Sequence, residues 1–144
     1  MILLVWAWGC VTEPTVAPPP PGELTTAGGH YRLVWTPVPK PVPLAELFEV
    51  QTKLLDARTG APVEDGSVHV DARMPQHGHG MATKPEDDPG VCPTGAPKGS
   101  PDCRHPGGVY VTRGMKFHMM GSWTMTFDVT GPAGADRVET EYRL

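Results

Sequence analysis

Apolar and polar residues alternate in several separate stretches of this chain. The clearest example runs from 123 to 129, where Trp, Met, Phe and Val alternate with Thr, Thr and Asp. Successive side chains of a β-strand point to opposite faces, so this period of two predicts a strand with one buried face. Strands are expected at 30–36, 48–54, 68–74, 108–112, 123–129 and 138–144. Because each has one apolar face, two antiparallel sheets must pack together, which predicts an all-β sandwich.

Proline and glycine divide the chain into parts. With 18 Pro and 17 Gly among 144 residues, turns and linkers are expected rather than long helices. Residues 11–29 have no hydrophobic period and contain four consecutive prolines, which predicts an extended linker. The folded domain is expected at 30–144, and its nearly apolar-free stretch 82–106 is expected to be a long loop. The net charge of −4 and the lack of a basic run argue against binding to nucleic acid or anionic lipid.

The first ten residues, MILLVWAWGC, resemble the signal peptide of a bacterial lipoprotein. Their apolar run is too short to span a bilayer, which needs about 20 residues, but it suits a signal peptide. Ala7 and Gly9 are the small residues expected before the lipidated cysteine of a lipobox, and Cys10 would carry the lipid. Trp8 and the absence of a basic residue before the run depart from that pattern. The alternative is an apolar N-terminus on a cytosolic protein.

Cys92 and Cys103 lie in the expected loop and are predicted to form a disulfide. Outside the cytoplasm, two cysteines that enclose a polar segment commonly pair, and closing such a loop contributes roughly 3 kcal/mol in the chain-entropy model. Cys10 is then unpaired, as lipidation requires. The alternative makes Cys103, His105 and Met115 copper ligands, although their spacing differs from the usual blue-copper loop.

Two segments, 74–81 and 115–121, concentrate side chains that bind transition metals. The candidate ligands are Met74, His77, His79 and Met81 in the first segment, and His118, Met119 and Met120 in the second. Imidazole binds Cu(II), Zn and Ni, whereas the soft thioether selects Cu(I) and stays usable where free thiolates oxidise. Copper is therefore the expected ion if both segments meet at one end of the sandwich. The alternative assigns Met74 to the core and the HGHG stretch to a polar loop.

The order of these motifs resembles the YtkA-like family of small bacterial extracytoplasmic domains. The resemblance covers about 48–129. It is carried by Met74-Pro75 with the following His and Met residues, by Gly108-Val109-Tyr110, and by the run Phe117–Trp123. It implies an immunoglobulin-like antiparallel β-sandwich of about seven strands, often exported and sometimes associated with copper handling. The chain departs from the family pattern by an insertion at 84–106, which contains the cysteine pair.

Together these features predict an exported, lipid-anchored protein of the bacterial envelope that binds or delivers copper. No nucleophile elbow, phosphate loop, HExxH helix or paired carboxylate site is present in the sequence, so we expect no enzyme activity. The alternative function is an interaction module that binds another exported protein without a metal. The two differ in one geometric expectation: the alternative predicts that His77, His79 and His118 lie more than about 10 Å apart, since ligands of one ion nearly touch.

Overall fold

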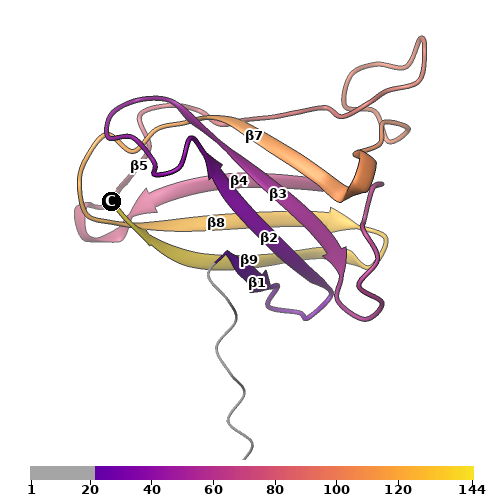
Figure 1. Cartoon of the computed structure of the whole chain (residues 1–144), viewed down its shortest axis with the longest axis horizontal. Coiled ribbons are helices and arrows are strands. Elements are labelled where there is room, and N and C mark those ends of the chain that lie inside the picture. Colours follow the sequence, from indigo (N-terminus) through magenta and orange to yellow (C-terminus); the bar gives the residue numbers. More distant parts are fainter. Residues whose placement is uncertain (1–21) are drawn as a thin grey trace, which may run out of the picture.

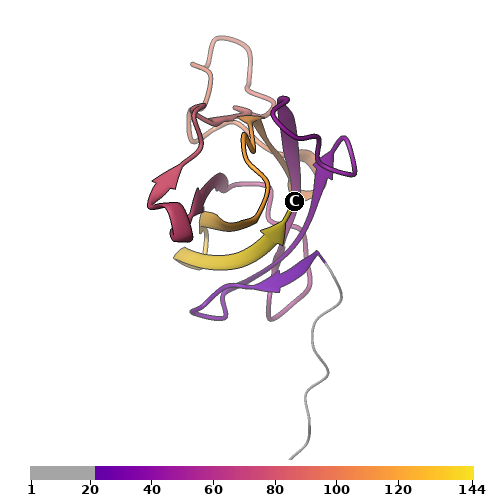
Figure 2. The ribbon, with the colours of Figure 1, turned by 90° about the vertical axis from the view of Figure 1, so that its left-hand side faces the viewer.

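The computed structural model describes residues 22–144, which form two antiparallel sheets packed face to face (Figure 1, Figure 2). The strands are β1 (Glu23–Thr25), β2 (Tyr31–Val38), β3 (Phe48–Asp56), β4 (Ser67–Met74), β5 (His79–Gly80), β6 (Glu86–Asp87), β7 (Val109–Met115), β8 (Ser122–Gly131) and β9 (Gly134–Arg143). Two short 3₁₀ helices, η1 (Pro75–His77) and η2 (Pro106–Gly108), complete the described elements. The predicted all-β sandwich is confirmed.

The strand order is that of an immunoglobulin-like domain. One sheet has the order β1-β2-β3-β7-β6 and the other β5-β4-β8-β9. In immunoglobulin terms β2, β3, β6 and β7 occupy the places of strands A, B, D and E, and β4, β8 and β9 those of C, F and G. The structure has nine strands in its described part rather than about seven, and two of these, β5 and β6, contain only two residues each.

The hydrophobic core lies between the two sheets. At one end of it, aromatic side chains support the connection from β7 to β8. Burial alternates along β8 as the sequence predicts, with residues 123, 125, 127 and 129 buried. Phe117, which follows β7, packs between two other aromatic rings. Its ring centroid is 4.9 Å from that of Phe48 and 4.6 Å from that of Trp123. Fully burying such side chains contributes roughly 2–3 kcal/mol each, so the chain at 116–121 starts from a firmly anchored residue.

The sandwich begins earlier than the sequence pattern suggested. Glu23–Thr25, inside the expected linker 11–29, pairs with β2, so the domain boundary lies before residue 23 rather than at 30. Strand β2 also continues through Pro37 to Val38, beyond the predicted end of this strand at residue 36. The Trp35 amide points to the β1 side of β2 and donates to Gly22 O. Pro37 has the same orientation but lies beyond the end of β1, so its missing N–H leaves no ladder bond unmade.

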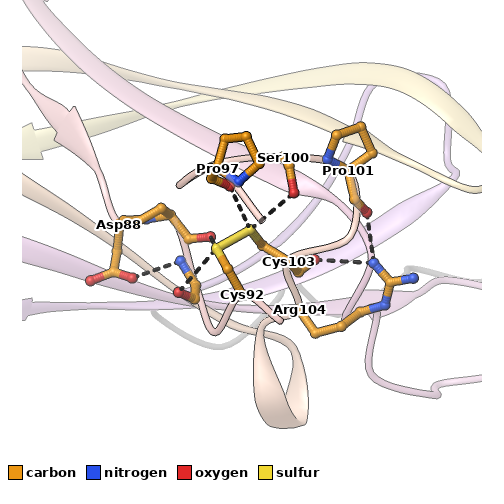
Figure 3. The surroundings of a disulfide bond; sticks show 9 residues. Asp88, Cys92, Pro97, Ser100, Pro101, Cys103 and Arg104 are labelled. Carbon is orange, nitrogen blue, oxygen red and sulfur yellow. Dashed lines mark hydrogen bonds between the residues drawn. A yellow bond between two sulfur atoms is a disulfide. The ribbon is translucent and has the colours of Figure 1, made fainter. Parts of the chain in front are cut away.

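The predicted disulfide is present and organises the loop 82–106. The Cα atoms of Cys92 and Cys103 are 4.0 Å apart, and the residues around the bond are shown in Figure 3. Backbone hydrogen bonds between Val91 and Arg104 flank the disulfide, so the two arms of the loop are joined by more than the sulfur atoms. Before it, β6 pairs with β7, and Asp87 of β6 reaches across to His69 of β4 with an oxygen–nitrogen distance of 2.8 Å.

Residues 1–21 lie outside the described part of the chain. The predicted signal peptide and the predicted lipidation of Cys10 fall there, as does most of the predicted linker. Between residues 22 and 144 no helix is long and apolar enough to cross a membrane.

Candidate functional site

The topology brings the two His- and Met-containing segments to the same end of the sandwich. Strand β4 ends at Met74, and its antiparallel partner β8 begins at Ser122, with Arg73 opposite Thr124. After β4 the chain makes the single turn η1 and folds back, so that His79 pairs with Met74. The connection 116–121, which carries His118, arrives at this end from β7. Figure 2 looks onto this end, where the C-terminus also lies; β5 and β9 are the two opposite edges of their sheet.

Three imidazoles, His77, His79 and His118, form a cluster that we call the histidine rim. The ring centroid of His79 is 5.8 Å from that of His77 and 5.2 Å from that of His118. Transition metals bind imidazole nitrogen at about 2 Å, so two rings on one ion have centroids roughly 4.5–6.5 Å apart. Both pairs fall in this range. Among residues 22–144, however, no group of three or more His, Cys, Asp or Glu side chains is arranged to hold a metal ion.

The nitrogens of the rim differ in what binds them. The Nδ1 atom of His79 lies 3.0 Å from the carbonyl oxygen of Gly80. A carbonyl can only accept, so Nδ1 carries the proton and the Nε2 lone pair of His79 is left for a ligand. The Nδ1 atom of His118 is buried and has no hydrogen-bond partner in the described structure. Among the described residues, this nitrogen lacks the hydrogen bond that a buried polar atom normally makes, which costs free energy.

Trp123 packs against two imidazoles of the histidine rim, a contact that the sequence pattern did not predict. Its indole is fully buried, and its Nε1–H donates to the carbonyl oxygen of Met119 at 3.0 Å. The rings of His118 and His79 meet it edge to face, with centroids 5.4 Å and 6.4 Å away. Alternation along β8 identified Trp123 as a core residue. Its contact with both imidazoles depends on the fold and has no local sequence signal.

The candidate thioethers are not equally accessible. Met74 is only 1% exposed and belongs to the core, as the alternative interpretation of that residue allowed. The sulfur of Met81 accepts a hydrogen bond from the backbone N–H of Lys116 at 3.4 Å, and Met119 is half-buried against the core. Met120 is 61% exposed. Of the candidate thioethers, that of Met120 is therefore the most accessible to solvent, and that of Met119 comes next.

The alternative copper site at Cys103, His105 and Met115 is wrong. Cys103 is joined to Cys92, so it has no thiolate to offer, and Met115 is completely buried. His105 stacks on Tyr110 with ring centroids 4.0 Å apart. Burial lowers the pKa of His105 and raises the pKa of Tyr110 to about 12, which describes a neutral structural pair rather than a ligand set.

A hollow at the other end of β4 and β8 was not predicted from the sequence. It has a volume of about 610 Å³ and lies between the disulfide loop and the ends of these strands, with Asp65, Asp87, Asp88 and Lys98 on its walls. Two of the carboxylates are already engaged. Asp87 contacts His69 and Thr112, and a hydrogen bond from Arg113 lowers the pKa of Asp88. These two carboxylates hold the loop to the sandwich.

Fold and rim together define a small immunoglobulin-like β-sandwich protein with a histidine cluster at one end. A DUF4426 family protein of Pseudomonas aeruginosa has a similar structure, with a TM-score of 0.54, 12% sequence identity and coverage of 85% of this chain and 94% of that chain. At this identity the likeness concerns the fold alone. No family model matches the chain, and no curated protein matches it either. The resemblance to the YtkA-like family therefore stays a prediction.

Proposed function

We propose that this chain binds copper at the histidine rim and delivers it outside the cytoplasm. The observation that carries the proposal is the meeting of His77, His79 and His118, which come from η1, β5 and the connection after β7. The spacing of His79 from each of the other two imidazoles suits ligands of one ion and is much smaller than the separation of about 10 Å that the metal-free alternative predicts. Their position on an exposed end suits exchange of the ion with another molecule.

Imidazole is the main donor in this proposal. The Nε2 of His79 is left for a ligand, and the Nδ1 of His118 has no partner among the described residues, so neither nitrogen is already engaged by the protein. These borderline nitrogen donors favour Cu(II), and the exposed thioether of Met120 adds a soft donor that suits Cu(I). Met74 and Met81 have structural roles and are left out of the ligand set that we propose.

The disulfide supports the proposed compartment. Structural disulfides persist in oxidising environments such as the periplasm and the cell surface, and are rare in the cytosol. A chain anchored through a lipid on Cys10 would hold the sandwich in such a compartment on the proline-rich segment that follows. Intact mass measurement of the chain purified from bacterial membranes tests this part, since cleavage before Cys10 and acylation each change the mass by a known amount.

Copper binding is tested by equilibrium dialysis of the full chain carrying Cys10→Ser, so that no free thiol competes for the ion. We expect binding at micromolar or tighter affinity, and its loss in the double variant His77→Ala/His79→Ala. The matched control is His30→Ala/His69→Ala, which also removes two partly exposed imidazoles but leaves the rim intact. Equal loss in both double variants, or no binding by the parent chain, would contradict the proposal and favour the interaction module.

A further inference from the structure

Strand β9 forms the longest sheet edge in the described part of the chain. Its ten residues pair with β8 on one side without a register shift, and it ends the sheet β5-β4-β8-β9 (Figure 1). The other sheet edges, β1, β5 and β6, contain only two or three residues each. An exposed edge presents a row of backbone N–H and C=O groups to which another strand can add.

Two contacts show which backbone groups of β9 face outward. The carbonyl oxygen of Arg137 accepts a hydrogen bond from Ala27, on the outer side of β9, whereas the backbone of Leu144 pairs with Gly121 on the β8 side. These directions alternate along an antiparallel strand, so the N–H and C=O groups of residues 139, 141 and 143 also point outward. Within residues 22–144 no strand pairs with them. We call the stretch 138–144 the open edge.

The side chains of the open edge alternate as well. Val138, Tyr142 and Leu144 are half-buried against the core, and the ring centroid of Tyr142 is 6.0 Å from that of Trp35 on the facing sheet. A strand added here would cover the apolar surface that these residues still expose. The residues between them are exposed and charged, namely Glu139, Glu141 and Arg143. Arg143 forms no ion pair with any other residue in 22–144.

A second copy of the open edge is complementary to this pattern in one antiparallel register. When the pairing is centred on Glu141, each Glu139 lies opposite Arg143 of the other copy, and each Val138 lies opposite Leu144. Opposite charges and apolar side chains placed in this way stabilise neighbouring strands. The central pair is the one like-charged contact. Each of its carboxylates already accepts a hydrogen bond at 2.7 Å from the serine that begins β8, which draws it toward its own sheet.

Other registers lose these contacts. Centred one residue earlier, the pairing sets Glu139 against Glu141 and Arg137 against Arg143, so like charges oppose one another throughout. Centred one residue later, it shortens to 140–144 and leaves Glu139 without an opposite charge. Still earlier centres are blocked, because the backbone of Ala27 already lies against the beginning of β9.

We infer that two copies of this chain associate through their open edges, in the register centred on Glu141, so that one sheet runs through both. The inference does not depend on the proposed copper binding. About six backbone hydrogen bonds join the two strands. The contact is isologous and uses the open edge of both copies, and the far edge of the sheet, β5, is too short to add another strand, so assembly stops at the dimer.

The small contact area predicts a weak dimer. One pair of short strands buries less than the roughly 1,200 Å² at the lower limit of standard interfaces, so we expect a dissociation constant on the order of 100 µM. Sedimentation velocity of the full chain with Cys10→Ser, from about 5 to 500 µM and with EDTA present to exclude metal bridging, measures it. Monomers over the whole range would overturn the inference, whether residues 1–21 or nothing at all covers the edge.

A proline at the centre of the pairing tests whether the edge itself is used. Glu141→Pro removes an N–H that faces outward and leaves the ladder between β8 and β9 complete, so it should abolish the dimer. Circular dichroism on heating checks that the variant is folded. Dimers that persist in the folded variant would show that another surface joins the copies, which would overturn the inference.

Charge variants test the register without altering the backbone. Glu139→Arg sets like charges opposite Arg143 and should weaken the dimer by roughly tenfold, whereas Glu139→Arg/Arg143→Glu should restore the affinity of the parent. The matched control is Glu46→Arg, which makes the same change of charge at an exposed residue between β2 and β3 and should have no effect. A dimer that Glu139→Arg tightens or leaves unchanged would overturn the register centred on Glu141.

Discussion

Replacement of Gly121 by alanine tests how tightly Met74 packs under the connection that leads into β8. Gly121 lies between Met120 and β8 and has a φ of 126°, a conformation that is essentially restricted to glycine. A Cβ atom at this position would lie 3.0 Å from the terminal methyl of Met74. Met74 is 99% buried, so its methyl group can move away only by disturbing the core.

The expected cost combines two effects. Forcing alanine into this conformation costs about 1–3 kcal/mol, and displacing a packed core side chain adds about 1 kcal/mol or more. Gly134→Ala is a control that isolates the first effect, since Gly134 has a φ of 102° but its added Cβ would meet nothing within 4 Å. We expect Gly121→Ala to reduce the free energy of unfolding by about 3 kcal/mol and Gly134→Ala by about 1–2 kcal/mol.

Urea denaturation followed by far-UV circular dichroism measures both variants. With a urea m-value of about 1.5 kcal/mol/M, the transition midpoint should fall by about 2 M for Gly121→Ala and about 1 M for Gly134→Ala. The reasoning about Met74 is refuted if the two variants lose the same stability. The reasoning about backbone conformation is refuted if neither loses any.

Three further predictions concern groups away from the rim. The Thr26 side chain and neighbouring backbone amides lower the pKa of Asp136, whose side chain is only 7% exposed. The ionised carboxylate therefore stabilises the fold at pH values above its ordinary pKa. This contribution is lost as the pH falls below about 4. Asp136→Ala should therefore cost about 1–3 kcal/mol at pH 7 in urea denaturation and clearly less at pH 3. Cys92→Ser/Cys103→Ser should cost up to about 3 kcal/mol, yet leave copper affinity in equilibrium dialysis unchanged because the loop is at the other end of β4 and β8. Burial raises the pKa of Tyr110 from 10.0 to about 12, so the free energy of unfolding of the parent chain should fall between these pH values. The stability of Tyr110→Phe should fall less over the same range. Equal pH dependence of the two thermal midpoints would contradict this assignment.

Local sequence was sufficient to predict most of the strands. Alternation works at 123–129 and 68–74 because each strand packs one face on the core and leaves the other in solvent. It missed Glu23–Thr25, since an edge strand of three half-exposed residues buries too little apolar surface to show a pattern. It also ended the first predicted strand too early, because whether Pro37 breaks a strand depends on which edge its nitrogen faces.

The histidine rim was only partly predictable. His77 and His79 are two residues apart, so their proximity follows from chain connectivity alone. The proximity of His79 to His118, about 40 residues later in the chain, depends on the pairing of β4 with β8, which no local pattern specifies. Trp123 could be predicted as a core residue but not as the aromatic surface that both imidazoles contact.

Local sequence was enough to predict a β-sandwich with a loop closed by Cys92 and Cys103, and to pick out the side chains whose chemistry suits copper. Which of those side chains are exposed or lie close together follows from tertiary packing. Met74 and Met120 are chemically identical, yet one fills the core and the other lies in solvent. The physical reason is that ligand chemistry belongs to the residue, whereas accessibility and spacing belong to the packing of strands far apart in the chain.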